Sequence, residues 1–136
     1  MSFEQDLKTW GKIEEYVIKL LKKRGWEAWK NETKDLKACD IYAKKDGITY
    51  LMEVKTDMMN MYTGNVGLEL KAINGSDSSY FIYILPQVFI SSTKIVKELM
   101  SSYPKVLGGD FNDEIALVPT NIFKSKSKDI TLYEPL

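Results

Sequence analysis

The residues from Cys39 to Lys55 read CDIYAKKDGITYLMEVK and form the most informative segment of the chain. It contains two short runs rich in apolar and β-branched residues, Cys39–Ala43 and Ile48–Lys55, a composition that is typical of strands. Between the runs stands Asp46-Gly47, a pair that tolerates the positive φ angles of a tight hairpin turn. We therefore predict two antiparallel strands joined by this turn.

Glu53 and Lys55 give the second of these runs its chemical character. Residues two apart in a strand project from the same face, so Glu53 and Lys55 are predicted to lie together while Val54 points to the opposite face. A glutamate and a lysine at this spacing also occur by chance on many half-exposed strands. The pair becomes informative only if further polar groups join it.

The register of the hairpin decides whether Asp40 is such a group. A two-residue turn at Asp46 and Gly47 places Asp40 directly across from Glu53, with Cβ atoms about 4.5–5.5 Å apart. Opposed like charges destabilise a sheet, so this arrangement favours a divalent cation between the carboxylates, and a ligand set made of oxygen points to Mg²⁺ or Mn²⁺. A three-residue loop Lys45–Gly47 with a glycine bulge would shift the register by one residue and separate the two carboxylates.

A long amphipathic helix is predicted before the hairpin. Ser2 followed by Gln5 resembles a capping box, and Gly25 ends the helical pattern. The apolar stripe of this helix consists of Leu7, Trp10, Ile13, Val17, Ile18 and Leu21. Glu14 falls inside the stripe and its neighbour Glu15 falls outside it. Because an unpaired carboxylate on a core-facing stripe is costly, we expect Glu14 to meet a metal site or a lysine at the sheet edge.

The remaining pattern predicts an α/β fold with a central mixed β-sheet flanked by helices, in one domain spanning residues 1–136. After a loop at residues 57–64, the expected elements are a strand at 65–70, a strand at 80–85, a helix at 93–101 and a strand at 115–118.

Composition excludes several classes of chemistry. The chain of 136 residues contains no histidine, which removes Ser-His-Asp hydrolysis and histidine-ligated zinc, and its single cysteine, Cys39, cannot form an internal disulfide. Nineteen basic residues balance nineteen acidic ones, so bulk charge indicates no strongly charged partner. The lone cysteine and the lack of a signal peptide or a membrane-length apolar run lead us to expect a cytoplasmic protein.

The sequence resembles the motif of the PD-(D/E)XK nuclease superfamily through four residues in order, namely Glu14, Asp40, Glu53 and Lys55. It departs from the nominal motif at Cys39, where the motif has a proline before the aspartate. The helix sequence IEEYVIKLLKKRGW is similar to the opening helix of archaeal Holliday-junction resolvases, and that similarity also selects Glu14 rather than Glu15. Four further segments of this chain resemble small phage-type endonucleases of the superfamily, namely MEVKTD, TGNVGLEL, SSYFIYIL and GGDFNDEIALVPTNIF.

The resemblance implies a role for each motif residue. Asp40 and Glu53 would hold the catalytic metal, Mg²⁺ or Mn²⁺, with the Val54 carbonyl as a further ligand. Lys55 would position or deprotonate the attacking water, and Glu14 would bind a water of the first metal or help hold a second. The implied activity is metal-dependent hydrolysis of phosphodiester bonds in DNA, with junction or branched DNA as a candidate substrate and a homodimer as the working form. The alternative is a catalytically silent nucleic-acid-binding protein of the same fold.

Two groups of polar residues outside the motif keep two interpretations each. Asp57, Asn65 and Glu69 either line the site or lie on a solvated edge. The basic residues Lys124, Lys126 and Lys128 either follow a phosphate backbone or simply face solvent. The run Lys22-Lys23-Arg24 is expected to be a solvated helix end, which the helix macrodipole favours. Zero net charge argues against tight nonspecific binding of DNA, because few surplus cations are available to displace counterions.

Overall fold

A computed structural model describes residues 3–32, 39–108 and 113–131 of the chain, with side chains of the first helix described from Lys12 onward. Helix α1 (Phe3–Lys23) ends as the sequence predicts, at Gly25, whose φ is 93°. The N–H of Gly25 donates to the Lys22 carbonyl (3.1 Å) and the N–H of Trp26 donates to the Leu21 carbonyl (3.0 Å). These two bonds form a Schellman cap that only a glycine accommodates without strain. The predicted cap at Ser2 lies outside the described residues.

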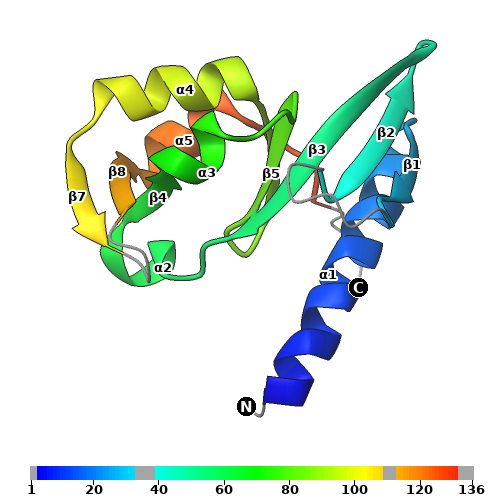
Figure 1. Cartoon of the computed structure of the whole chain (residues 1–136), viewed down its shortest axis with the longest axis horizontal. Helices are drawn as coiled ribbons and strands as arrows, with labels where there is room; N and C mark the ends of the chain where they lie inside the picture. The colour runs from blue at the N-terminus through cyan, green and yellow to red at the C-terminus, as the bar shows by residue number, and fades with distance from the viewer. Residues whose placement is uncertain (1–2, 33–38, 109–112, 132–136) are drawn as a thin grey trace.

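The main sheet has six strands in the order β1-β2-β3-β5-β6-β9 (Figure 1). Strands β3 and β5 run parallel and every other neighbouring pair is antiparallel, so the predicted mixed sheet is confirmed. The strand bounds are β1 Glu27–Lys30, β2 Ile41–Lys45, β3 Ile48–Thr56, β5 Tyr80–Ile84, β6 Val88–Ser92 and β9 Lys128–Asp129.

A second group of elements lies on the other side of β5 from the hairpin, at the left of Figure 1. Its three-stranded antiparallel sheet has the order β4-β8-β7, with bounds β4 Asn65–Glu69, β7 Lys105–Gly108 and β8 Asp113–Pro119. Four helices accompany it, namely α2 Asn60–Thr63, α3 Leu70–Asn74, α4 Thr93–Ser102 and α5 Thr120–Lys126.

Several short elements were not predicted, and their sequences explain why. Strand β1 is four residues long, and β6 is buried along most of its length, so neither shows the alternation of a half-buried strand. The predicted loop at residues 57–64 contains the single turn of α2. Of the three lysines near the end of the chain, Lys124 and Lys126 lie in helix α5 and Lys128 lies in strand β9.

The two faces of β3 belong to two separate parts of the hydrophobic core. Met52 and Val54 are buried against α1, in a cluster that also contains Val17, Leu20, Leu21, Ile41, Ala43 and Ile82. Glu53 and Lys55 project from the opposite face, because they pair with Phe81 and Tyr83 of the second cluster. That second cluster also includes Val66, Leu68, Ile73, Val96, Val118 and Phe123.

The hairpin register follows the prediction made from the turn. Residues from Ile41 to Lys45 pair in order with residues from Met52 to Ile48, so the turn consists of Asp46 and Gly47 alone. Both have positive φ, 53° for Asp46 and 79° for Gly47. This is the backbone of a type I′ turn, which matches the twist of the flanking strands. The alternative three-residue loop is therefore excluded.

Candidate active site

Asp40 lies immediately before β2, beside the Glu53–Val54 peptide of β3. Its N–H donates to the Met52 carbonyl at 3.0 Å, and the N–H of Val54 donates to its Oδ2 at 2.8 Å. The carboxylate therefore replaces a backbone acceptor where the regular pairing of β2 and β3 ends. Asp40 is thus adjacent to Glu53 through the hairpin, as the register predicts, and one of its oxygens is used to hold the β3 backbone.

Glu53 and Lys55 share a face of β3 and contact each other. Lys55 Nζ lies 3.7 Å from Glu53 Oε2, and the side chains are 31% and 17% exposed, respectively. The Ser76 hydroxyl donates a hydrogen bond to Glu53 Oε1, and the N–H of Ser78 donates to Ser76 Oγ at 3.1 Å. Both carboxylate oxygens of Glu53 therefore have a partner. Lys55 contacts Oε2, and Ser76, in the segment after α3, holds Oε1.

Glu14 is held on the α1 side of the sheet. Lys30 of β1 lies 3.5 Å from Glu14 Oε2, and Glu14 is 23% exposed whereas Glu15 is exposed. Of the two partners expected for Glu14, the structure shows a lysine at the sheet edge. Lys30 pairs with Ile41, the residue after Asp40, so the Glu14–Lys30 ion pair lies one residue along β2 from Asp40. Glu53 and Lys55 project from the other face.

These residues offer the kind of donors that a hard divalent cation requires. Asp40 and Glu53 supply carboxylate oxygens, and Val54 supplies a backbone carbonyl, a set that suits Mg²⁺ or Mn²⁺. Within the described segments of the chain, no three acidic or cysteine side chains are close enough together to hold a metal ion by themselves. A cation at this place would therefore use two carboxylates, the carbonyl and water, as Mg²⁺ commonly does.

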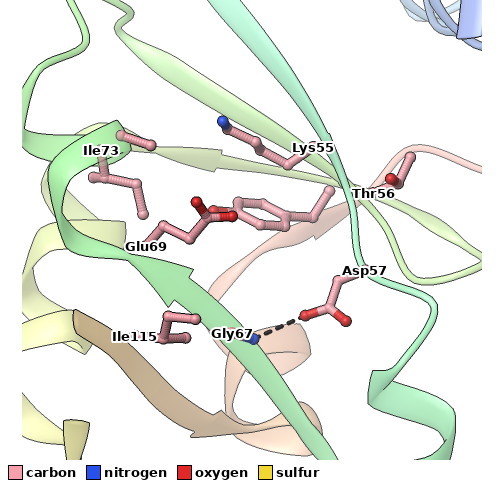
Figure 2. A pocket seen from close by; sticks show the side chains of 9 residues that line it. Lys55, Thr56, Asp57, Gly67, Glu69, Ile73 and Ile115 are labelled. Atoms are coloured by element: carbon pink, nitrogen blue, oxygen red, sulfur yellow. Dashed lines mark hydrogen bonds between the residues drawn. The ribbon is translucent and has the colours of Figure 1, made fainter. Parts of the chain in front are cut away.

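A cavity of about 180 Å³ opens next to Lys55, and Asp57, Gly67 and Glu69 line it. Figure 2 shows Lys55 of β3 and Glu69 of β4 reaching into this cavity from opposite walls. Asp57 is fixed at its base, because its N–H donates to the Ile84 carbonyl at 3.0 Å and its Oδ2 accepts from the N–H of Gly67 at 2.8 Å. A lysine and two carboxylates thus surround a space of the size of a few water molecules.

Tyr83 forms the buried wall of the same cavity and is 3% exposed. Its burial raises the pKa of the phenol, and the charges of Glu69, Asp57 and Glu53 raise the pKa further. The hydroxyl consequently stays protonated at every physiological pH. It is a neutral group that can donate a hydrogen bond toward the carboxylates.

Sequence analysis named some of the residues that line this region, and it did not name Ser76 or Tyr83. Asp57 and Glu69 line the cavity, whereas Asn65 bonds to Thr63 instead. Ser76 was not considered because nothing in a short polar loop marks one serine as a partner of a distant glutamate. Tyr83 could have been placed on the Lys55 face only by knowing that β5 pairs in parallel with β3.

Two solved structures share this arrangement of elements. The bacterial homing endonuclease I-Ssp6803I superposes with a TM-score of 0.53 at 23% identity, covering 81% of this chain and 73% of its own. The Holliday junction resolvase Hjc of the hyperthermophilic archaeon Archaeoglobus fulgidus superposes with a TM-score of 0.57 at 11% identity, covering 91% of this chain and 98% of its own. The chain therefore has the α/β fold of these two nucleases, in agreement with the restriction-endonuclease-like fold expected from its sequence.

Comparison with protein-family models and with curated proteins gave no match. None of the described helices combines the length and the apolar character that crossing a membrane requires.

Proposed function

We propose that the protein is a metal-dependent DNA endonuclease that hydrolyses phosphodiester bonds. The observation that carries this proposal is the register of the β2–β3 hairpin, which brings Asp40 beside Glu53, Val54 and Lys55. The same fold in a homing endonuclease and in a junction resolvase supports it.

In this proposal Asp40 and Glu53 hold the cation together with the Val54 carbonyl. Asp40 keeps Oδ1 available, because its Oδ2 accepts the Val54 N–H, and this bond fixes the carboxylate against β3. Ser76 orients Glu53 in the same way through Oε1. A bound Mg²⁺ or Mn²⁺ would polarise the scissile phosphate and lower the pKa of a coordinated water.

Lys55 and Glu14 have two further roles in the proposed site. Lys55 is one-third exposed beside Glu53, so its ammonium can contact the scissile phosphate, stabilise the developing negative charge and orient the attacking water. Glu14 acts as an outer carboxylate that holds a metal-bound water or a second cation after exchanging its contact with Lys30. Its partner Lys30 pairs with Ile41, the residue after Asp40, so this role requires Glu14 to reach the cation from the α1 face of the sheet, opposite to Glu53.

Branched DNA is the substrate we propose to test first, because one of the two solved neighbours is a Holliday junction resolvase. Cutting two strands with one site per chain requires two chains, and a symmetric dimer is the simplest assembly that provides them. Sedimentation of the protein with and without a four-way junction would measure this assembly.

The experiment that tests the proposal is cleavage of a labelled DNA panel that contains duplex, single-stranded, flap and four-way-junction substrates. We expect cleavage with Mg²⁺ or Mn²⁺ and none in excess EDTA, because the oxygen ligands require a hard divalent cation. Ca²⁺ should bind without supporting comparable cleavage, since its coordination is longer and looser. Undiminished cleavage in EDTA would contradict the mechanism.

The alternative function, a nucleic-acid-binding protein that does not cleave, predicts a different result on the same panel. If this alternative is right, the protein binds DNA in the presence of each divalent metal, and no cleavage product forms with any of them. The charged pair of Glu53 and Lys55 on one strand face favours the enzyme, because a protein that only binds DNA gains nothing from a carboxylate held at the phosphate site.

A further inference from the structure

A second cavity, of about 440 Å³, lies away from the candidate active site, and four cationic side chains line it. They come from separate parts of the chain: Arg24 follows α1, Lys45 ends β2, and Lys126 and Lys128 flank the junction of α5 and β9. No aspartate or glutamate is among the described residues that line it. We call this cavity, with its four cations, the basic groove.

The four cations of the basic groove have other contacts than carboxylates within the part of the chain that the structure describes. The Arg24 guanidinium donates to the Thr131 carbonyl at 2.8 Å, and Lys45 Nζ lies 5.2 Å from the centre of the Trp26 ring. None of the four forms an ion pair with a carboxylate of the described chain. Asp129 follows Lys128 in strand β9, so the two side chains point to opposite faces, and its Oδ1 accepts the N–H of Thr131 at 2.8 Å.

The lining of the basic groove is partly aromatic and packs against the core. Trp26 and Tyr80 line it and pack edge to face, with ring centres 6.2 Å apart, and Tyr50 packs against both. Ile90 and Ile130, which also line it, belong to the core on the α1 side of the sheet. The cations are thus presented on a fixed surface, which lowers the ordering cost of binding a ligand.

The basic groove and Lys55 lie apart on the same sheet. Tyr80 starts β5, whereas Lys55 pairs with Tyr83, which is about 10 Å further along the strand at 3.3 Å per residue. Lys55 also projects from the face opposite to the one on which Trp26 and Ile90 pack. A ligand of the groove therefore does not occupy the site of cleavage.

We propose that the basic groove binds the phosphate backbone of DNA at a place removed from the phosphate that is cleaved; this inference rests on the proposed function. Four cations around one open cavity, none of them ion-paired with a described carboxylate, repel one another, and a chain of regularly spaced phosphates relieves that repulsion more completely than a single anion does. The groove also explains how a chain with zero net charge can bind DNA, since local charge rather than total charge sets the field at a surface.

The test measures DNA binding in EDTA, where no metal-dependent cleavage interferes, by fluorescence anisotropy of a labelled junction and a labelled duplex over about 50–200 mM salt. In the double variant Lys126→Ala/Lys128→Ala we expect affinity to fall roughly tenfold or more at low salt. The slope of log K against log salt should become smaller by about 2, because two phosphate contacts are lost.

The matched control is Lys97→Ala/Lys105→Ala, which removes the same charge from exposed lysines outside the groove. It should keep the slope of the wild type, and Lys126→Arg/Lys128→Arg should keep it as well, because arginine retains the positive charge. Circular dichroism and melting temperatures of all variants show that the fold is intact.

Equal slopes for the groove variant and the control would overturn the proposal. A second result would also overturn it: tight binding of inorganic phosphate or of a deoxynucleoside monophosphate that requires Lys126 and Lys128, together with DNA binding that does not require them. The occupant of the groove would then be a small anion. The proposed nuclease activity can fail independently of the groove. If the wild type does not cleave DNA in Mg²⁺ while the groove variant still shows a smaller slope, the nuclease proposal is contradicted and the proposal for the basic groove is not.

Discussion

The two polar surfaces of this protein differ in charge although the chain is neutral. Around the end of β3 lie the carboxylates of Asp40, Glu53, Asp57 and Glu69 and one ammonium group, that of Lys55, and we call this region the acidic surface. In the basic groove, four cations share one cavity that no described carboxylate lines. In our proposals the acidic surface holds a metal ion, at Asp40 and Glu53, and the basic groove binds phosphates.

This separation shows how net charge misleads for a nuclease-like fold. The total of zero predicts weak binding of DNA, but it counts residues and ignores where the fold places them. Opposite charges that are kept apart on the surface are not neutralised by each other over a distance beyond the Debye length, about 8–10 Å in physiological salt. Each surface can therefore act on its own ligand.

The largest effect is expected when the acidic surface loses its function while the basic groove is left intact. Asp40→Asn and Glu53→Gln keep the hydrogen bonds with Val54 and Ser76 but remove the charge, so cleavage should fall below detection with the fold preserved. Lys55→Ala should slow cleavage by about 10²–10⁴-fold. Single-turnover cleavage measures the rates, and Lys44→Ala, an exposed lysine of β2, is the control.

Asp40→Asn and Glu53→Gln should still bind DNA in EDTA, because neither variant removes a cation and the basic groove is unchanged. Wild-type cleavage rates in Asp40→Asn would contradict the assignment of the site. Loss of DNA binding in all of these variants would contradict the separation of the two surfaces.

A smaller effect is expected from the two adjacent glutamates of α1. Glu14→Gln should lower the cleavage rate, because Glu14 is the carboxylate placed near Asp40, while the loss of its half-exposed pair with Lys30 should cost below about 1 kcal/mol. Glu15→Gln, at an exposed position, should change the rate and the stability little, within about 0.5 kcal/mol. Single-turnover rates and thermal melts of both variants provide the comparison, and an inactive Glu15→Gln beside an active Glu14→Gln would reverse the assignment.

The smallest effect concerns Tyr83, which lies beneath the acidic surface. Its pKa is raised above the ordinary value of 10.0, first by burial and then by Glu69, Asp57 and Glu53. Above about pH 10 the unfolded chain loses this proton and the folded chain keeps it, so stability falls as pH rises, by up to about 1.4 kcal/mol per pH unit. Tyr83→Phe should remove this part of the loss.

Denaturant unfolding between neutral pH and strongly alkaline pH measures the effect of Tyr83. Tyr62→Phe is the control, because Tyr62 is 80% exposed and its substitution should leave the pH dependence as in the wild type. The same pH dependence in Tyr83→Phe and in the wild type would show that Tyr83 is not the group responsible.

Prediction from sequence succeeded where neighbouring residues fix the structure. The Asp46-Gly47 turn alone set the hairpin register, and with it the position of Asp40 beside Glu53. The apolar stripe of α1 distinguished Glu14 from Glu15, although Leu20, which is fully buried, was not counted in that stripe. Short or fully buried strands such as β1 and β6 were missed, because their sequences carry no periodic pattern.

By itself, then, the sequence determined the class of fold, the hairpin and the motif residues, because turn chemistry and strand alternation act over a few residues. Only the tertiary structure decided which side chains from distant segments meet. The parallel pairing of β3 with β5 puts Tyr83 beneath Lys55, and the packing of β4 beside them brings Glu69 into the same cavity. Likewise, Arg24 and Lys128 share a groove because the ends of α1 and β9 come together, a contact between segments that no local pattern encodes.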